Sequence, residues 1–400
     1  MIRSPSWAPR LRPSSLRMEE PRVTNRPLPV LRAMIDAIDR DMLQLMARRM
    51  AIVGEIAAYK REHQVPIRDR SREREVIADR CGRAEKLGLP REEIEAIYRL
   101  VLLTSRDHQA ALRAELPMQI EPKSVAVVGG KGGMGSLLAR LFGDLGHAVL
   151  IADVDTPLTP EEAAHSADVV VISVPIGVTE EVIRRLGPHV RAEALLMDVT
   201  SIKEAPLRAM MDATASTGAS VVGTHPMFGP GVHSLQGQRV VLCRGRGEAW
   251  YDWLTKMLSA RGLVLTEADP REHDRAMGLV QVLTHFQTQV LGLALSRLGV
   301  DLRETLRFTS PAYLMELYVA ARHFAQSPRL YGPIEMLNPI RDEVTGAFIA
   351  AAQELSGILR RGDQPAFEAM FAEVRRFFGD FTDEALVQSS FLIDRVVERS

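Results

Sequence analysis

The chain has 400 residues, of which 46% are hydrophobic and 25% are charged, and its formal net charge is −1. This composition is typical of a globular protein with two or three domains, and the balanced charge argues against nucleic acid or a membrane surface as a partner. The two cysteines, Cys81 and Cys243, show no metal-site spacing and no disulfide framework. We therefore expect no metal, no transmembrane segment and a cytoplasmic location.

The first 26 residues are rich in Arg, Pro and Ser and lack an apolar signal core. This pattern predicts a disordered tail over residues 1–27, with a targeting peptide as the alternative.

Residues 28–117 have the periodicity of an all-helical domain. The first helix starts near Pro29 and is interrupted at Pro66, a second starts near Ser71, and a third starts at Arg91. Such a unit is too thin to bury a good core alone, so we expect two chains to pack their helices together.

Two cations in the first helix stand out, because they project near the centre of its apolar stripe. The stripe falls within an arc of roughly 120° and comprises Leu45, Met46, Ile52, Val53 and Ile56. Arg49 and Lys60 lie within that arc. Burying an unpaired cation costs several kcal/mol, so these two side chains indicate a bound anion.

The periodicity changes after a short polar linker. Residues 123–268 contain short, β-branched apolar runs that alternate with helical segments, which is typical of a doubly wound, Rossmann-type parallel sheet. Residues 269–400 again have a helical pattern, and we expect a helical domain there that completes a substrate site and a dimer interface.

A glycine-rich loop follows the first apolar run and opens a helix. It has G-x-G-x-x-G spacing, which lets the backbone approach a pyrophosphate at a helix N-terminus. The candidate cofactor-binding residues are Gly130, Gly132, Gly133, Met134, Gly135 and, at the end of the next run, Asp153. The aspartate favours NAD over NADP, because it would bind ribose hydroxyls and repel a 2′-phosphate. A glycine turn that binds nothing, and FAD, are the alternatives.

His225 ends the fifth apolar run, at the edge of the sheet where doubly wound folds bind ligands. Its near-neutral pKa would let it accept a hydroxyl proton while hydride leaves for NAD. Ser201 and Lys203 follow the preceding run and should lie at the same edge. The alternative for His225 is a structural loop histidine.

Together these motifs resemble the bifunctional T-proteins of tyrosine biosynthesis, which fuse chorismate mutase to prephenate dehydrogenase. The resemblance rests on "ARRMAIVGEIAAYK", "VVGGKGGMG", "HPMFGP" and "AARHFAQSP". It implies two reactions: rearrangement of chorismate to prephenate, and NAD-dependent oxidative decarboxylation of prephenate to 4-hydroxyphenylpyruvate. It also implies a homodimer.

For the mutase reaction, the resemblance implies that Arg32, Arg49 and Arg72 hold the two substrate carboxylates, with help from Ser105. Arg32 projects roughly 100° away from Arg49 on the same helix. This offset is compatible with the family arrangement, in which the first arginine comes from the partner chain.

The remaining polar residues of the mutase set would act on the ether oxygen and the ring hydroxyl. Lys60 and Gln109 would donate to the breaking ether bond, and Asp69 and Glu73 would contact the hydroxyl or nearby backbone groups. A pericyclic rearrangement needs no acid or base, only a compressed dianion and donors aimed at developing charge.

For the dehydrogenase, the resemblance implies that His225 takes the C4 hydroxyl proton and that Arg322 binds a substrate carboxylate. Ser201 would assist at the hydroxyl, and Lys203 would support the same region.

Leu314 occupies a position where some members of the family carry an arginine. His273 and His285 also match family histidines, and we expect packing or local hydrogen bonds there. The alternative function is an arogenate or cyclohexadienyl dehydrogenase with a non-catalytic, regulatory mutase-like domain.

Overall fold

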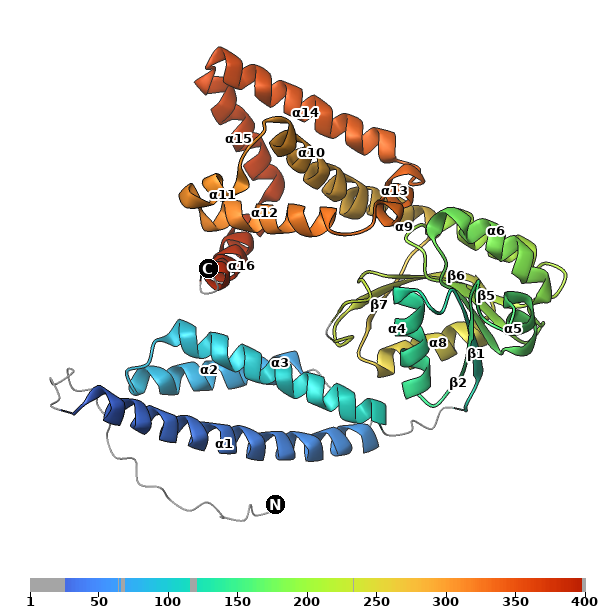
Figure 1. Ribbon diagram of the computed structural model, residues 1–400, viewed down its shortest axis with the longest axis horizontal. Helices are drawn as coiled ribbons and strands as arrows, with labels where there is room; N and C mark the ends of the chain where they lie inside the picture. The colour runs from blue at the N-terminus through green and yellow to red at the C-terminus, as the bar shows by residue number, and fades with distance from the viewer. Residues whose placement is uncertain (1–25, 64, 66–68, 116–120, 233, 398–400) are drawn as a thin grey trace. The chain divides into compact units, whose positions relative to one another are not determined.

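The computed structural model describes residues 26–63, 65, 69–115, 121–232 and 234–397. These form two compact units, one built on the N-terminal helices and the other on the sheet and the C-terminal helices (Figure 1). The predicted tail lies almost wholly outside the described residues, as does Pro66.

Three helices make up the N-terminal unit: α1 (Leu28–Glu62), α2 (Arg70–Lys86) and α3 (Arg91–Glu115). The carboxylate of Asp69 caps α2 by accepting the backbone N–H of Arg72 at 2.9 Å. Among the helices that the structure describes, α3 packs against both α1 and α2.

The apolar stripe predicted for α1 is not a core face within one chain. Val53 is buried at 5% exposure, but Leu45 and Ile52 keep 61% and 57% of their surface exposed. Further large apolar side chains of the helix are also exposed, among them Leu28, Met34, Ile35, Ile38, Met42, Leu43, Met46 and Ile56. Within one chain α3 covers only the face that includes Val53, so the rest of the stripe is left for the second chain that the sequence predicts.

The second unit is built on a seven-stranded sheet in the order β2-β1-β3-β4-β5-β6-β7. The strands are β1 (Ser124–Val128), β2 (Ala148–Ala152), β3 (Val169–Ile172), β4 (Leu195–Asp198), β5 (Ser220–Pro226), β6 (Arg239–Arg246) and β7 (Val264–Glu267). The first five run parallel, as predicted. Strand β6 is antiparallel to β5, and β7 is parallel to β6, so the sheet is mixed rather than wholly parallel.

Helices connect these strands: α4 (Gly133–Asp144), α5 (Pro160–Ser166), α6 (Ile176–Leu186), a short 3₁₀ turn η1 (Gly187–His189), α7 (Glu204–Ala213) and α8 (Glu248–Ala260). Strands β1, β3 and β4 are buried along almost their whole length. Their unbroken apolar runs are explained by helices covering both faces of the sheet. The core therefore holds the carboxyl edge of the strands in fixed positions.

The C-terminal region is helical, as predicted (Figure 1). It comprises α9 (Pro270–Met277), η2 (Gly278–Leu283), α10 (Thr284–Arg297), α11 (Leu302–Thr305), η3 (Leu306–Phe308), α12 (Pro311–Phe324), α13 (Pro328–Met336), α14 (Arg341–Arg361), α15 (Gln364–Phe378) and α16 (Phe381–Val397). Segment η2 is a π-helical turn, a feature often found at functional sites. Among the described residues, no helix is long and apolar enough to cross a bilayer.

Candidate active sites

The glycine loop joins β1 to α4 through one left-handed residue, Gly129, with φ +79°. Its N–H donates to the carbonyl of Ala152 at the end of β2, at 2.8 Å. A side chain at this position would be strained by the backbone and would overlap the backbone of Ser173. The sharp turn directs the chain straight into α4.

A second glycine, Gly135, allows the first turn of α4 to lie directly on the loop. A Cβ added there would lie 2.8 Å from the Cα of Gly130 and would overlap the carbonyl oxygen of Gly129. Helix α4 begins at Gly133 and is capped by Gly132, which has no side chain to occupy the helix N-terminus. The N–H groups at this end, including that of Met134, therefore form a site that fits the pyrophosphate of a dinucleotide.

Asp153 lies just past β2, beside the glycine loop. Its Oδ2 accepts the backbone N–H of Lys131 at 3.0 Å, and its Oδ1 accepts that of Val154 at 2.8 Å. The Lys131 ammonium lies 2.8 Å from a carboxylate oxygen of Asp155. Two backbone N–H groups thus hold the Asp153 carboxylate beside the glycine loop.

His225 is the penultimate residue of β5 and is only 2% exposed. Its Nδ1 lies 2.8 Å from Nε2 of His273 on α9, and its Nε2 lies 3.4 Å from the side-chain amide nitrogen of Gln281 in η2. Burial holds the pKa of His225 well below its usual value, and the neighbouring His273 and Lys203 lower it further. The ring is therefore neutral at neutral pH and able to accept a proton.

Lys203 lies at the same edge of the sheet, but its ammonium group is fully buried and already satisfied. An ammonium has three donors, and Nζ contacts the Asp198 carboxylate, the Thr224 carbonyl at 2.7 Å and the Thr200 hydroxyl at 3.3 Å. The ammonium group thus has three partners within the protein, and its contact with the Thr224 carbonyl fixes the backbone next to His225.

Ser201 has a half-buried side chain in the loop between β4 and α7. Because β4 and β5 are parallel neighbours, this loop starts at the carboxyl edge that also carries His225. The structure thus places Ser201 at the edge where the sequence predicts it.

Asp274 and Gln281, two further residues of this site, were not predicted from the sequence. His273, for which packing or local hydrogen bonds were expected, contacts the adjacent Asp274 carboxylate and also His225, and the second contact was not predicted. The adjacent His and Asp were visible in the sequence. Their contact with β5, however, spans 48 positions, which helical periodicity does not reveal.

Arg322 lies on α12 with an exposed side chain, close enough to Tyr331 to counteract the rise that burial causes in the pKa of that phenol. Leu314, at the position of the arginine found in some family members, is buried at 7% exposure. His285 lies 3.7 Å from Glu335, and burial together with His323 lowers the pKa of its ring to about 4.

In the N-terminal unit, one chain brings Arg49, Ser105 and Gln109 together. The Arg49 guanidinium donates to the Ser105 hydroxyl, and the Gln109 amide donates to the Ser105 carbonyl at 3.2 Å. Ser105 and Gln109 are 4% and 8% exposed. The amide oxygen of Gln109 is buried without a partner among the described residues. Lys60 is half-buried on α1.

The other polar residues predicted for the mutase site have different neighbours in one chain. Arg32 is exposed, and Arg72 is exposed and lies 3.1 Å from Glu75. Asp69 serves as the N-cap of α2, while Glu73 pairs with Arg106 at 2.6 Å. A single chain therefore presents only part of the predicted set in one cluster.

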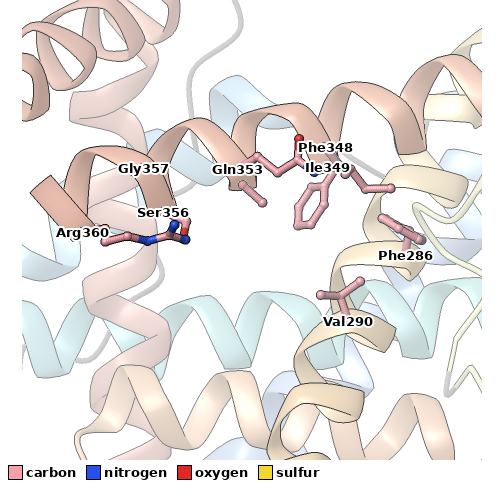
Figure 2. A pocket seen from close by; sticks show the side chains of 9 residues that line it. Phe286, Val290, Phe348, Ile349, Gln353, Ser356, Gly357 and Arg360 are labelled. Carbon is pink, nitrogen blue, oxygen red and sulfur yellow. The ribbon is translucent and has the colours of Figure 1, made fainter.

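A separate cavity of about 420 Å³ lies between α10 and α14. Figure 2 shows Phe286 and Val290 on α10 facing Phe348 on α14, with Arg360 farther along α14. Arg360 is the only ionisable residue among those lining it, so the cavity provides no acid or base at neutral pH.

The fold and the His225 site define an NAD-dependent dehydrogenase that carries a helical unit at its N-terminus. Three family models match successive segments of the chain. Residues 31–110 match chorismate mutase type II, residues 146–266 match the nucleotide-binding domain of prephenate dehydrogenase, and residues 269–373 match its dimerization domain.

Two curated relatives extend over nearly the whole chain. The T-protein of Enterobacter agglomerans is 36% identical over 92% of this chain and 97% of its own length. The T-protein of Haemophilus influenzae is 34% identical over 91% and 96%. The chain belongs to the T-protein family. It is a bifunctional enzyme of tyrosine biosynthesis, with a chorismate mutase and an NAD-dependent prephenate dehydrogenase.

The fold of the dehydrogenase part is similar to a solved structure of prephenate dehydrogenase from Aquifex aeolicus in complex with hydroxyphenyl propionate and NAD⁺. The two share 18% identity with a TM-score of 0.52, over 65% of this chain and 99% of that one.

Proposed function

We propose that His225 is the base of the dehydrogenase and that Arg49, Lys60 and Gln109 form the centre of the mutase site. The observation that carries the first assignment is the neutral, buried imidazole at the carboxyl edge of the sheet, the edge that also carries the glycine loop after β1. A charged histidine could not accept a proton there.

In the dehydrogenase reaction, the C4 hydroxyl of prephenate gives its proton to Nε2 of His225 as the C4–O bond gains double-bond character. The glycine loop and Asp153 would hold NAD, which would supply the acceptor for the hydride of C4. The ring carboxylate then leaves as carbon dioxide, and its electron pair makes the ring aromatic. The proton held by His225 returns to the phenolate oxygen, so no net proton is released.

Two other side chains orient the substrate in this proposal. Arg322 binds a substrate carboxylate through its exposed guanidinium, and Ser201 donates to or accepts from the C4 hydroxyl. Leu314 also lies on α12 but carries no charge. Of these two residues, Arg322 is therefore the one that can bind a carboxylate.

The test of the base is His225→Asn. We expect NAD binding, measured by fluorescence titration, to persist, while the rate of prephenate oxidation falls by about 10²–10⁴-fold. Mutase activity of the same chain is the folding control. Unchanged dehydrogenase kinetics would reject the assignment.

In the mutase reaction, the protein supplies charge and shape rather than proton transfer. Arg49 holds a carboxylate of chorismate, oriented by its bond to the buried Ser105. Lys60 and the second N–H of the Gln109 amide stabilise negative charge on the ether oxygen as the C–O bond breaks.

The remaining mutase residues come from an assembly of two chains in our proposal. The exposed apolar side chains of α1, with Leu45 and Ile52 more than half exposed, form a surface that a second copy would cover. Arg32 of the second copy would complete the carboxylate site. The matched dimerization domain supports the same homodimer. The buried free thiols of Cys81 and Cys243 are compatible with the cytoplasm.

Arg49→Ala tests the mutase assignment, with the exposed neighbour Arg48→Ala as control. We expect Arg49→Ala to abolish conversion of chorismate and to leave oxidation of supplied prephenate intact. Equal loss of both activities would indicate structural collapse. Sedimentation equilibrium tests the homodimer, and a monomer with full mutase activity would contradict it.

A further inference from the structure

Three buried side chains form a continuous chain of contacts behind the proposed base. Asp274 Oδ1 lies 2.8 Å from Nδ1 of His273, and Nε2 of His273 lies 2.8 Å from Nδ1 of His225. The three residues are each only 2% exposed. The two rings meet edge to face, with centroids 5.1 Å apart and planes at 72°.

The hydrogen positions in this chain follow from its far end. The Asp274 carboxylate accepts the backbone N–H of Lys203 at 2.7 Å on Oδ1 and that of Glu204 at 3.0 Å on Oδ2. Backbone amides can only donate, so both carboxylate oxygens are acceptors. His273 therefore donates from Nδ1, which leaves its Nε2 as an acceptor.

The same logic sets the tautomer of the base. Because Nε2 of His273 accepts, Nδ1 of His225 carries the hydrogen and Nε2 of His225 carries the lone pair. The amide nitrogen of Gln281, 3.4 Å away, is a donor and fits a lone pair at that position. The lone pair of His225 thus points away from α9 and is available to a substrate hydroxyl.

We propose that His273 and Asp274 are positioning residues that hold His225 in the tautomer with Nε2 as proton acceptor and stabilise the charge it gains. This inference rests on the proposed role of His225 as the base. When the hydroxyl proton binds to Nε2 of His225, Nδ1–H of His225 donates a hydrogen bond to Nε2 of His273. Nδ1 of His273 in turn contacts the Asp274 carboxylate. The positive charge is then shared over two rings beside an anion in a site that excludes water.

Lys203 makes this arrangement necessary. Its buried ammonium lies near His225 and lowers the pKa of that ring, so it opposes the positive charge that forms during the reaction. Its own carboxylate partner is Asp198. The Asp274 carboxylate, reached through His273, is the acceptor that can offset this repulsion.

Two substitutions of His273 separate the two contacts of the ring. Asn places its amide near the position of Nδ1, so His273→Asn can keep the contact to Asp274 and loses the contact to His225. Gln places its amide near the position of Nε2, so His273→Gln can still accept from His225 but does not reach Asp274. We expect kcat for prephenate oxidation to fall by about 10²-fold in the first variant and about tenfold in the second.

The readouts distinguish positioning from simple packing. The KM for prephenate and the Kd for NAD should stay within about twofold, because His273 is buried and contacts His225 and Asp274, and mutase activity should be unchanged. Ring ¹⁵N NMR of the ligand-free enzyme labelled at histidine, assigned with His225→Asn, should show His225 protonated at Nδ1 in the parent. In His273→Asn we expect that signal to move toward the Nε2-protonated form.

Several outcomes would overturn the proposal. A parent enzyme with His225 protonated at Nε2 contradicts it directly, even if both variants fail to fold. Unchanged kcat and an unchanged tautomer in His273→Asn contradict it as well. If His225→Asn itself remained active, the base assignment would fail first, whereas an inactive His225→Asn with fully active His273 variants would remove only the positioning role.

Discussion

Lys203→Met tests the buried ion pair under the dehydrogenase site. Methionine keeps most of the volume and removes the charge, so the Asp198 carboxylate loses its counter-ion. Both side chains are 0% exposed in the folded state, so water cannot replace the lost contact. Removing one partner of a buried pair costs about 3–5 kcal/mol. The hydrogen bond from Thr200 N to Asp198, at 3.0 Å, remains, and we expect a loss near the lower limit, about 3 kcal/mol.

Urea unfolding followed by tryptophan fluorescence measures this loss, because Trp250 and Trp253 on α8 lie in the same unit and contact each other. The matched control is Lys123→Met, which removes an ammonium paired with Glu121, a carboxylate that is 79% exposed. That control should cost less than about 1 kcal/mol. If the two variants lost the same free energy of unfolding, the ion pair would not be a stabilising element and the reasoning would be refuted.

The same substitution should also change the pH dependence of the dehydrogenase. Lys203 lowers the pKa of His225, so its removal should raise that pKa. The acidic limb of kcat/KM would then move to higher pH, because His225 must be neutral to accept the proton.

Three further predictions concern the cofactor site and acid stability. Gly135→Ala should abolish NAD binding in fluorescence titrations while mutase activity persists, because its Cβ would overlap Gly129; Gly143→Ala on the same helix, with its nearest neighbour at 3.9 Å, should bind NAD normally. Asp153→Ser should raise the ratio of kcat/KM with NADP to that with NAD, since the carboxylate that repels a 2′-phosphate is gone; an unchanged ratio would contradict this role. His285 has a pKa of about 4 in the fold against 6.5 ordinarily, so the unfolded chain binds its proton first and stability falls as the pH drops below 6.5. When the pH is lowered from 7 to 5, the free energy of unfolding measured with urea should fall by about 2 kcal/mol less in His285→Gln than in the parent. Equal decreases in the two proteins would exclude this histidine as the cause.

Much of the second unit could be predicted because its sequence signals are local. The apolar runs around Val127, Val170 and Leu196 are continuous since these strands are covered on both faces, and the structure confirms the strands they predict. The glycine loop was recognisable from its spacing and its place between a strand and a helix. The reversal of β6 was missed, because strand direction depends on how the chain returns from β5 and not on the composition of β6.

The features of the sites that were not predicted all depend on tertiary contacts. Nothing in the sequence around Lys203 shows that its ammonium has three internal partners, and the link from His225 to His273 depends on how α9 packs against β5. The face of α1 was predicted to be buried from its apolar residues alone. Helical periodicity does not show which neighbour buries a given side chain. Ile52 and Val53 therefore had the same prediction, although only Val53 is buried within one chain.

The open apolar face of α1 makes protein concentration a variable in measurements on this enzyme. In the proposed homodimer, a helix that keeps Leu45 and Ile52 exposed within one chain would gain stability from association, so we expect the unfolding midpoint of the N-terminal unit to rise with protomer concentration. The His225, His273 and Asp274 contacts lie within one chain and carry no such dependence. We therefore expect dilution to reduce the chorismate mutase activity without disturbing the hydrogen bonds that hold His225, the proposed base of the dehydrogenase.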